Sequence, residues 1–165
     1  MDPIRLMSRI IDIMSGFPYI QGMPFEEKRA WAMVVVTVCA YATYLAVILG
    51  RAGDVPLAEV PYAAALLWSI GGAIGASIVL HTVLSTFSPP GEAGRKDQRD
   101  REINRFGEYV GQSFVVIGGV AALGLSLAEV AYFWIANAVY LAFVLSSLLG
   151  STAKIVSYRL GFHPW

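Results

Sequence analysis

Residues 132–153 read YFWIANAVYLAFVLSSLLGSTA and contain no Asp, Glu, Lys or Arg. A helix needs roughly 17 to 25 predominantly apolar residues to cross the hydrocarbon core of a bilayer, and this stretch is long enough. Three further stretches of the same character cover residues 30–49, 62–84 and 109–125. The sequence therefore predicts an all-α polytopic membrane protein, a bundle of four transmembrane helices.

The composition of the whole chain agrees with this prediction. Of its 165 residues, 56% are hydrophobic, and the mean hydropathy is +0.60. Soluble domains have an apolar fraction nearer to about 45–50%. A single membrane domain, residues 23–165, accounts for nearly all of the chain, and the lipid bilayer is its first expected partner.

Basic residues lie almost entirely on one side of the predicted spans. Of the 12 Lys and Arg residues, only Arg51 falls in a loop on the opposite side. Lys and Arg near helix ends favour the cytoplasmic side of a membrane. We therefore expect a multi-pass protein of the bacterial inner membrane, with both termini and the 91–108 segment in the cytoplasm and short loops 50–61 and 126–131 outside.

Residues 1–22 have two interpretations. Their apolar side chains recur at helical spacing, which predicts a short amphipathic helix at the cytoplasmic interface. The alternative is a disordered extension that precedes a true translation start at Met23. A secretory signal is not expected, because Arg9 and Asp12 interrupt its would-be apolar core.

A short motif occurs twice in the chain. Residues 57–62 read LAEVPY, and residues 127–132 read LAEVAY. This match predicts two duplicated helical hairpins related as a parallel repeat, a type known in some transporters. The alternative is that a repeat this short arose by chance in apolar sequence.

The glutamates of this motif are expected at the outer ends of helices. Ser126 and Glu129 have the spacing of a capping box, in which the two side chains accept hydrogen bonds from free backbone N–H groups of the first turn. In the first copy, Glu59 follows Asp54 and Pro56, which suit a helix start. The competing interpretation makes Glu59 and Glu129 external carboxylates that gate a cation path.

The segment 91–108 between the second and third spans is dense in charges of both signs. Its second half is rich in helix formers, so the third helix is expected to begin in the cytoplasm and to project roughly 12 Å from the membrane. A cytoplasmic protein is one expected partner of this projection, and a simple solvated helix end is the alternative. The candidate partner-binding residues are Asp97, Arg99, Asp100, Arg101 and Arg105.

Small residues recur at close-packing intervals in three of the spans. Small side chains let helix backbones approach closely, which drives helix association in lipid. This pattern favours a compact bundle or a homodimer. The candidate packing residues are Gly71, Gly75, Gly111, Gly118 and Gly150.

Among the polar side chains within the spans, three are larger than Ser or Thr and are not tyrosines or tryptophans: His81, Gln112 and Asn137. An unsatisfied polar group in hydrocarbon is costly, so each is expected to bond a neighbouring helix. Asn137 has an alternative role as a substrate contact, and His81 as a proton acceptor or haem ligand. Because the other histidine, His163, lies in the polar tail, only a dimer would bring two membrane histidines together.

Known catalytic signatures are absent from the sequence. It contains no phosphate-binding glycine loop, no His-Glu-x-x-His and no serine flanked as a nucleophile elbow. Cys39 is the single cysteine, so one chain cannot assemble a thiolate metal site. We expect no catalytic residue, no metal, no cofactor and no direct contact with nucleic acid.

Several segments resemble a family of small uncharacterised bacterial four-helix membrane proteins. They are MPFEEKRAW at 23–31, DQRDREI at 97–103, GEYVG at 107–111 and FWIAN at 133–137. The Asp-x-Arg-Asp-x-x-Ile pattern is also similar to that of a broader bacterial membrane family whose genes often neighbour helix-turn-helix regulators. This resemblance implies a membrane partner of a regulator and implies no catalytic residues.

The sequence as a whole favours a non-catalytic membrane protein. It would be a regulatory partner or an accessory subunit of a larger complex that contacts a cytoplasmic protein through residues 97–108. The alternative function is a small transporter or channel with a parallel two-hairpin repeat. Transporters of that kind usually place charged or discontinuous elements at mid-membrane, and the four spans have none.

Overall fold

The computed structural model describes residues 25–53, 55–86 and 98–160, and these residues are helical apart from short connections. Each of the four long helices is long and apolar enough to cross a membrane, which confirms the predicted all-α fold with four candidate spans. The elements are α3 (Phe25–Ala52), the short 3-10 helix η1 (Leu57–Glu59), α4 (Ala63–Thr86), α5 (Gln98–Leu127) and α6 (Tyr132–Leu160). The predicted 1–22 segment lies outside the described residues.

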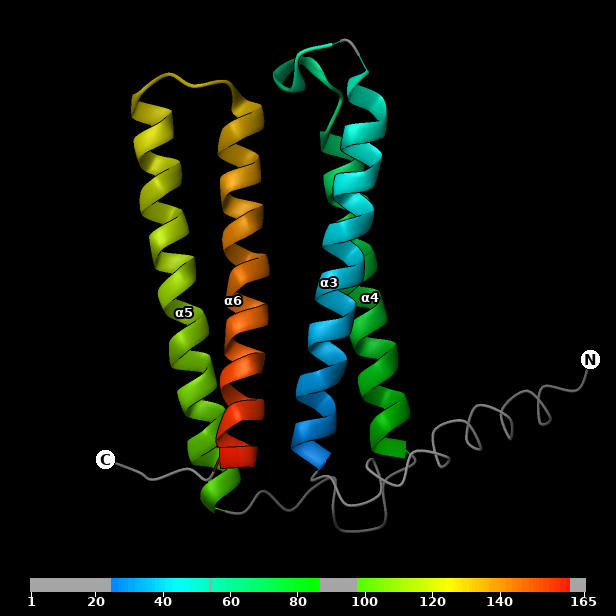
Figure 1. Ribbon diagram of the computed structural model, residues 1–165, viewed down its shortest axis with the longest axis vertical. Helices are drawn as coiled ribbons and strands as arrows, with labels where there is room; N and C mark the ends of the chain where they lie inside the picture. Colours follow the sequence, from blue (N-terminus) through cyan, green and yellow to red (C-terminus); the bar gives the residue numbers. More distant parts are fainter. Residues whose placement is uncertain (1–24, 54, 87–97, 161–165) are drawn as a thin grey trace, which may run out of the picture.

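Successive helices run antiparallel, and α6 lies between α5 and α3 (Figure 1). Helix α4 packs mainly against α3, so the spatial order is α5, α6, α3, α4. The starts of α3 and α5 and the ends of α4 and α6 lie together at one end, which we call the basic end. The opposite end, which carries η1 and the α5–α6 connection, is the loop end.

Helix α4 has no buried residue. Its large side chains are open to the surroundings: Leu67 is 69% exposed and Trp68 is 81% exposed. A helix that is apolar nearly all round and leaves most of its side chains exposed would be unstable in water. Lipid tails solvate such a surface without cost, so this helix fits a membrane environment.

A seam of glycines joins α5 to α6. A Cβ atom added to Gly111 would lie 2.9 Å from the carbonyl oxygen of Ser146, and one added to Gly150 would lie 2.8 Å from that of Gly107. A Cβ atom added to Gly118 would collide with the Cβ of Ala142. Only glycine permits such close backbone approach. The predicted packing roles of Gly111, Gly118 and Gly150 are therefore confirmed.

The glycines of α4 behave differently. A Cβ added to Gly71 or Gly75 would meet no atom within 4 Å. Gly71 and Gly75 therefore do not pack the helices of one chain against each other, and the homodimer that the same spacing allows stays a prediction. The small-residue spacing in α4 is the same as in α5, but α4 turns this face away from its neighbours.

The Ser126 and Glu129 capping box is also wrong. Ser126 lies inside α5, and Glu129 follows its end with a φ of 53°. The Glu129 N–H donates to the Ser126 carbonyl (3.1 Å), and the Val130 N–H donates to the Leu125 carbonyl (3.1 Å). These two bonds form a Schellman motif, so the segment terminates α5 and does not start α6.

Glu59 also lies outside the first turn of the next helix. It closes η1, whereas α4 begins at Ala63. Residues 57–62 thus form a 3-10 turn and an extended segment, and residues 127–132 form a helix end and a turn. The two copies of the motif adopt different local structures, and the duplicated hairpin stays a prediction.

Candidate functional site

Three tyrosines meet inside the membrane-spanning part of the molecule. Tyr41 and Tyr44 of α3 face Tyr140 of α6, with ring centroids 5.6 and 5.1 Å from that of Tyr140 and near edge-to-face geometry. Tyr44 is 1% exposed and belongs to the main apolar core. Edge-to-face contacts of this kind stabilise aromatic pairs beyond the burial of their area.

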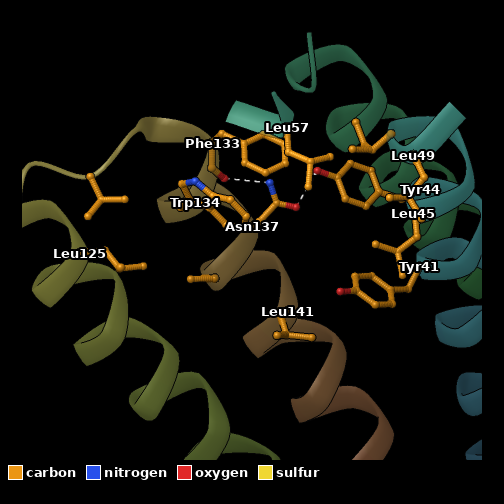
Figure 2. A pocket seen from close by; sticks show the side chains of 13 residues that line it. Tyr41, Tyr44, Leu45, Leu49, Leu57, Leu125, Phe133, Trp134, Asn137 and Leu141 are labelled. Atoms are coloured by element: carbon orange, nitrogen blue, oxygen red, sulfur yellow. Dashed lines mark hydrogen bonds between the residues drawn. The ribbon is translucent and has the colours of Figure 1, made fainter. Parts of the chain in front are cut away.

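Each buried hydroxyl of this tyrosine cluster has a partner. The Tyr44 hydroxyl donates to Asn137 Oδ1 of α6 (2.7 Å), and Asn137 Nδ2 donates to the Phe133 carbonyl (2.8 Å) (Figure 2). Because a carbonyl only accepts, this second bond fixes which way the amide points. The predicted interhelical hydrogen bond of Asn137 is therefore confirmed.

A serine of α4 completes the network. Ser69 Oγ lies 3.0 Å from the carbonyl oxygen of Ala40, to which it donates, and 2.6 Å from the Tyr140 hydroxyl. It therefore connects α4 to both α3 and α6. Sequence reasoning selected Asn137 but missed Tyr44, Tyr140 and Ser69. The available signal was the presence of Tyr41, Tyr44 and Tyr140 inside predicted spans, because a phenol hydroxyl within hydrocarbon needs a hydrogen-bond partner.

An apolar cavity of about 610 Å³ adjoins the tyrosine cluster (Figure 2). It lies between α3 and α6, and at the loop end it is bordered by η1 and the end of α5. Every described side chain that lines it is uncharged, and most are aliphatic or aromatic. Its lining residues are Tyr41, Tyr44, Leu45, Ile48, Leu49, Leu57, Leu125, Val130, Phe133, Trp134, Asn137, Ala138 and Leu141.

His81 and Gln112 lie at other cavities. His81 and Arg29 line a space of about 350 Å³ between α3 and α4. Gln112 lines a polar space of about 640 Å³ between α3, α5 and α6 near the basic end, together with Glu108 and Lys154. Within the described ranges, neither His81 nor Gln112 makes the expected hydrogen bond to another helix.

The basic end is held together by polar bonds between three helices. Asn104 of α5 donates to Glu26 of α3 (3.1 Å). Arg159 of α6 pairs with Glu27 of α3 at 3.1 Å. Glu26 and Glu27 are only 9% and 5% exposed, so both carboxylates are nearly removed from solvent. Buried carboxylates need such partners, and breaking one pair would strand a charge.

A third bond ties α5 to α6. The Tyr158 hydroxyl donates to Asp100 Oδ1 at 2.8 Å. Tyr158 lies beyond the apolar stretch that ends at Ala153. Burial, then the hydrogen bond to Asp100 and its negative charge, raise the pKa of the Tyr158 phenol well above its usual range.

The candidate partner-binding residues therefore separate into two groups. Asp100 is committed to Tyr158 within the chain. Arg99, Arg101 and Arg105 are exposed, and none of them forms an ion pair inside the described part of the chain. Asp97 lies outside the described residues. In the same ranges, no group of three or more His, Cys, Asp or Glu side chains is arranged to hold a metal ion.

Comparisons with known proteins give no assignment. No protein-family model, no curated protein and no solved structure matches the chain. The resemblance of residues 23–31, 97–103 and 133–137 to small bacterial four-helix membrane proteins stays a prediction. Function must therefore be argued from the chain's own geometry.

Proposed function

We propose that this chain is a non-catalytic protein of the bacterial inner membrane whose basic end lies in the cytoplasm and holds an acidic segment of another protein. It acts as a regulatory partner or as an accessory subunit of a larger complex. The observation that carries this proposal is the first part of α5, which is fixed to its neighbours on one side and carries exposed arginines on the other.

The fixed side of α5 is well anchored. Ile103 is 0% exposed, Asn104 bonds Glu26, and Asp100 bonds Tyr158. The eleven residues 98–108 directly precede the apolar stretch of α5. At the rise of an α-helix they extend over roughly 16 Å. A partner therefore meets a helix whose conformation is already set, and binding loses little ordering entropy.

Of the four exposed charged side chains in residues 98–108, three are arginines and the fourth is Glu108. Arg101 and Arg105 are four residues apart, so they lie on the same face of the helix. Arginine binds carboxylates in a planar, two-pronged geometry that lysine does not offer. Acidic side chains of a partner are the complementary chemistry, and the association should weaken with salt.

The orientation of the chain follows from the same charges. Lys28, Arg29, Lys154 and Arg159 lie with the arginines of α5 at the basic end, and Arg51 lies at the loop end. Lys and Arg flanking spans are retained in the cytoplasm. The basic end is therefore the face that a cytoplasmic regulator would reach.

Cross-linking in native membranes followed by affinity capture tests the proposal. Wild type should recover an acidic protein, and Arg101→Glu with Arg105→Glu should lose it. The matched control is Arg101→Lys with Arg105→Lys, which keeps the charge and should retain most of the recovery. Two results would contradict the proposal. If wild type captures no protein, the arginines bind lipid phosphates instead. If charge reversal has no effect on recovery, the arginines do not hold the partner.

A small transporter or channel is the second candidate, and one observation favours it. The cavity of about 640 Å³ between α3, α5 and α6 is lined by Glu26, Arg29, Glu108 and Lys154, with three serines of α6. Solute flux into proteoliposomes that is lost in Glu108→Gln or Lys154→Gln would support this function, because both side chains line this cavity. Absence of flux in a correctly folded protein would argue against transport and would leave partner binding at the basic end as the proposed function.

A further inference from the structure

The apolar cavity beside the tyrosine cluster has unused hydrogen-bonding groups. Within the described residues, the Tyr41 hydroxyl makes no hydrogen bond, and Figure 2 shows it directed toward α6. Asn137 uses one N–H for the Phe133 carbonyl, so its second N–H has no partner there. Trp134 also lines the cavity, and its indole N–H makes no hydrogen bond within the described residues. Tyr41, Asn137 and Trp134 thus border the cavity with donors that are not used inside the chain.

The Tyr41 and Asn137 donors lie at a depth within the membrane where few other hydrogen-bond partners are present. Asn137 lies five residues into α6, roughly 8 Å from the loop end, and Tyr41 lies roughly 16 Å from the end of α3. Water at that depth is scarce, so a donor there gains from any acceptor that reaches it. Leu45, Leu49 and Leu141 are 37%, 61% and 40% exposed, so the cavity opens laterally toward lipid.

The lining restricts the chemistry of an occupant. Among the described residues, no Lys, Arg or His lines the cavity, so this lining offers no positive charge to a phosphate or carboxylate headgroup. Its volume of about 610 Å³ lies within the usual range of small-molecule sites, which are mostly apolar with a few placed polar groups. Each of the three unused groups can donate, and the amide and indole N–H groups can only donate, so a ligand that supplies acceptors is the one that satisfies them.

We propose that this cavity binds a neutral membrane-soluble molecule with carbonyl acceptors on an apolar ring, that is, a quinone-like lipophile. The Tyr41 hydroxyl and the second N–H of Asn137 each donate to a carbonyl oxygen of the ligand. Trp134 and Phe133 contact its ring. Entry is lateral from lipid. This inference depends on the membrane fold and is independent of the partner proposed for the basic end.

Duroquinone is a suitable probe, because quinones quench indole fluorescence on contact and Trp134 lines the cavity. The assay uses Trp31→Phe, Trp68→Phe and Trp165→Phe, which leave Trp134 as the only indole, in lipid nanodiscs. Quenching of Trp134 fluorescence should saturate as the duroquinone concentration rises. The matched control keeps only Trp68, which is 81% exposed and should report simple partitioning with no saturation.

Two comparisons test the hydrogen bonds. Tyr41→Phe in the Trp134 background keeps the ring contacts, and loss of one neutral hydrogen bond should raise the half-saturating concentration roughly two- to tenfold. Durene has the same tetramethylated ring without carbonyls, so it should not displace duroquinone at equal concentration. An unchanged thermal melt of Tyr41→Phe confirms that the fold is intact.

The proposal is overturned by any of three results. Quenching of Trp134 that rises without saturation, as at Trp68, would mean that the probe only partitions into lipid. Equal displacement by durene would mean that the cavity accepts any hydrocarbon, as an acyl chain would. An unchanged half-saturating concentration of duroquinone in Tyr41→Phe would mean that the Tyr41 hydroxyl does not bind the ligand.

Discussion

Replacing Gly150 with alanine tests the close packing of α5 against α6. A Cβ at this position would lie 2.8 Å from the Gly107 carbonyl oxygen and 3.6 Å from the Gly111 Cα. Both atoms belong to the backbone and cannot rotate aside, so the helices must separate. Restoring a contact of about 3.5 Å at the oxygen requires a movement of roughly 0.7 Å.

A separation of this size weakens the whole seam. A gap of roughly 0.5–1 Å removes about a quarter to a half of the dispersion energy of each contact it opens. Overpacking of this kind costs about 1–3 kcal/mol. Gly75→Ala is the matched control, because its new Cβ meets nothing within 4 Å. Replacing glycine with alanine raises helix propensity by about 1 kcal/mol at both positions. The difference between the unfolding free energies of the two variants therefore reports the clash alone.

The measurement is reversible unfolding of both variants in mixed detergent micelles with increasing SDS, followed by far-ultraviolet circular dichroism. Gly150→Ala should be less stable than Gly75→Ala by about 1–3 kcal/mol. Equal stabilities would mean that the glycine seam is looser than the structure describes. A lower stability of Gly75→Ala would mean that the tight helix contact involves α4 and not the α5–α6 seam.

Three further predictions use the same unfolding assay. A double-mutant cycle of Tyr44→Phe and Asn137→Leu should give a coupling of about 0.6–1.7 kcal/mol, and additive effects would deny the 2.7 Å bond. Glu129→Gly should stabilise the chain by about 1 kcal/mol, because glycine adopts a φ of 53° without strain; a loss of stability would contradict this. Because the folded state raises the pKa of Tyr158, the stability this residue contributes is present below its unfolded pKa of 10.0 and is lost as pH rises through the raised value. The alkaline loss of stability should be smaller in Tyr158→Phe, and an identical pH profile would argue against the bond to Asp100.

Long apolar stretches made the number and approximate limits of the helices predictable from the sequence. Interior α5 and α6 glycines were also predictable, because tight association in lipid needs small residues. Gly71 and Gly75 show the limit of that argument. In a helix that is apolar all round, sequence cannot tell a face that meets lipid from a face that meets a neighbour.

The polar sites were harder to predict. Asn137 was recognisable because an amide inside a span needs a partner, but nothing in the sequence identified Tyr44 as that partner. Ser126 and Glu129 have the spacing of an N-terminal cap, yet α5 continues to Leu127 and the same residues form its C-terminal turn. Local motifs at helix ends depend on where the helix stops, and apolar composition sets that limit only loosely.

Labelling of single cysteines by a membrane-impermeant maleimide tests the central claim most directly. In a Cys39→Ala background, Val55→Cys at the loop end and Arg101→Cys at the basic end occupy exposed positions at opposite ends of the helices. The account predicts that intact spheroplasts label Val55→Cys alone and that Arg101→Cys is labelled only after lysis. Equal labelling of both positions in intact spheroplasts, or recovery of the chain in the soluble fraction, would contradict it.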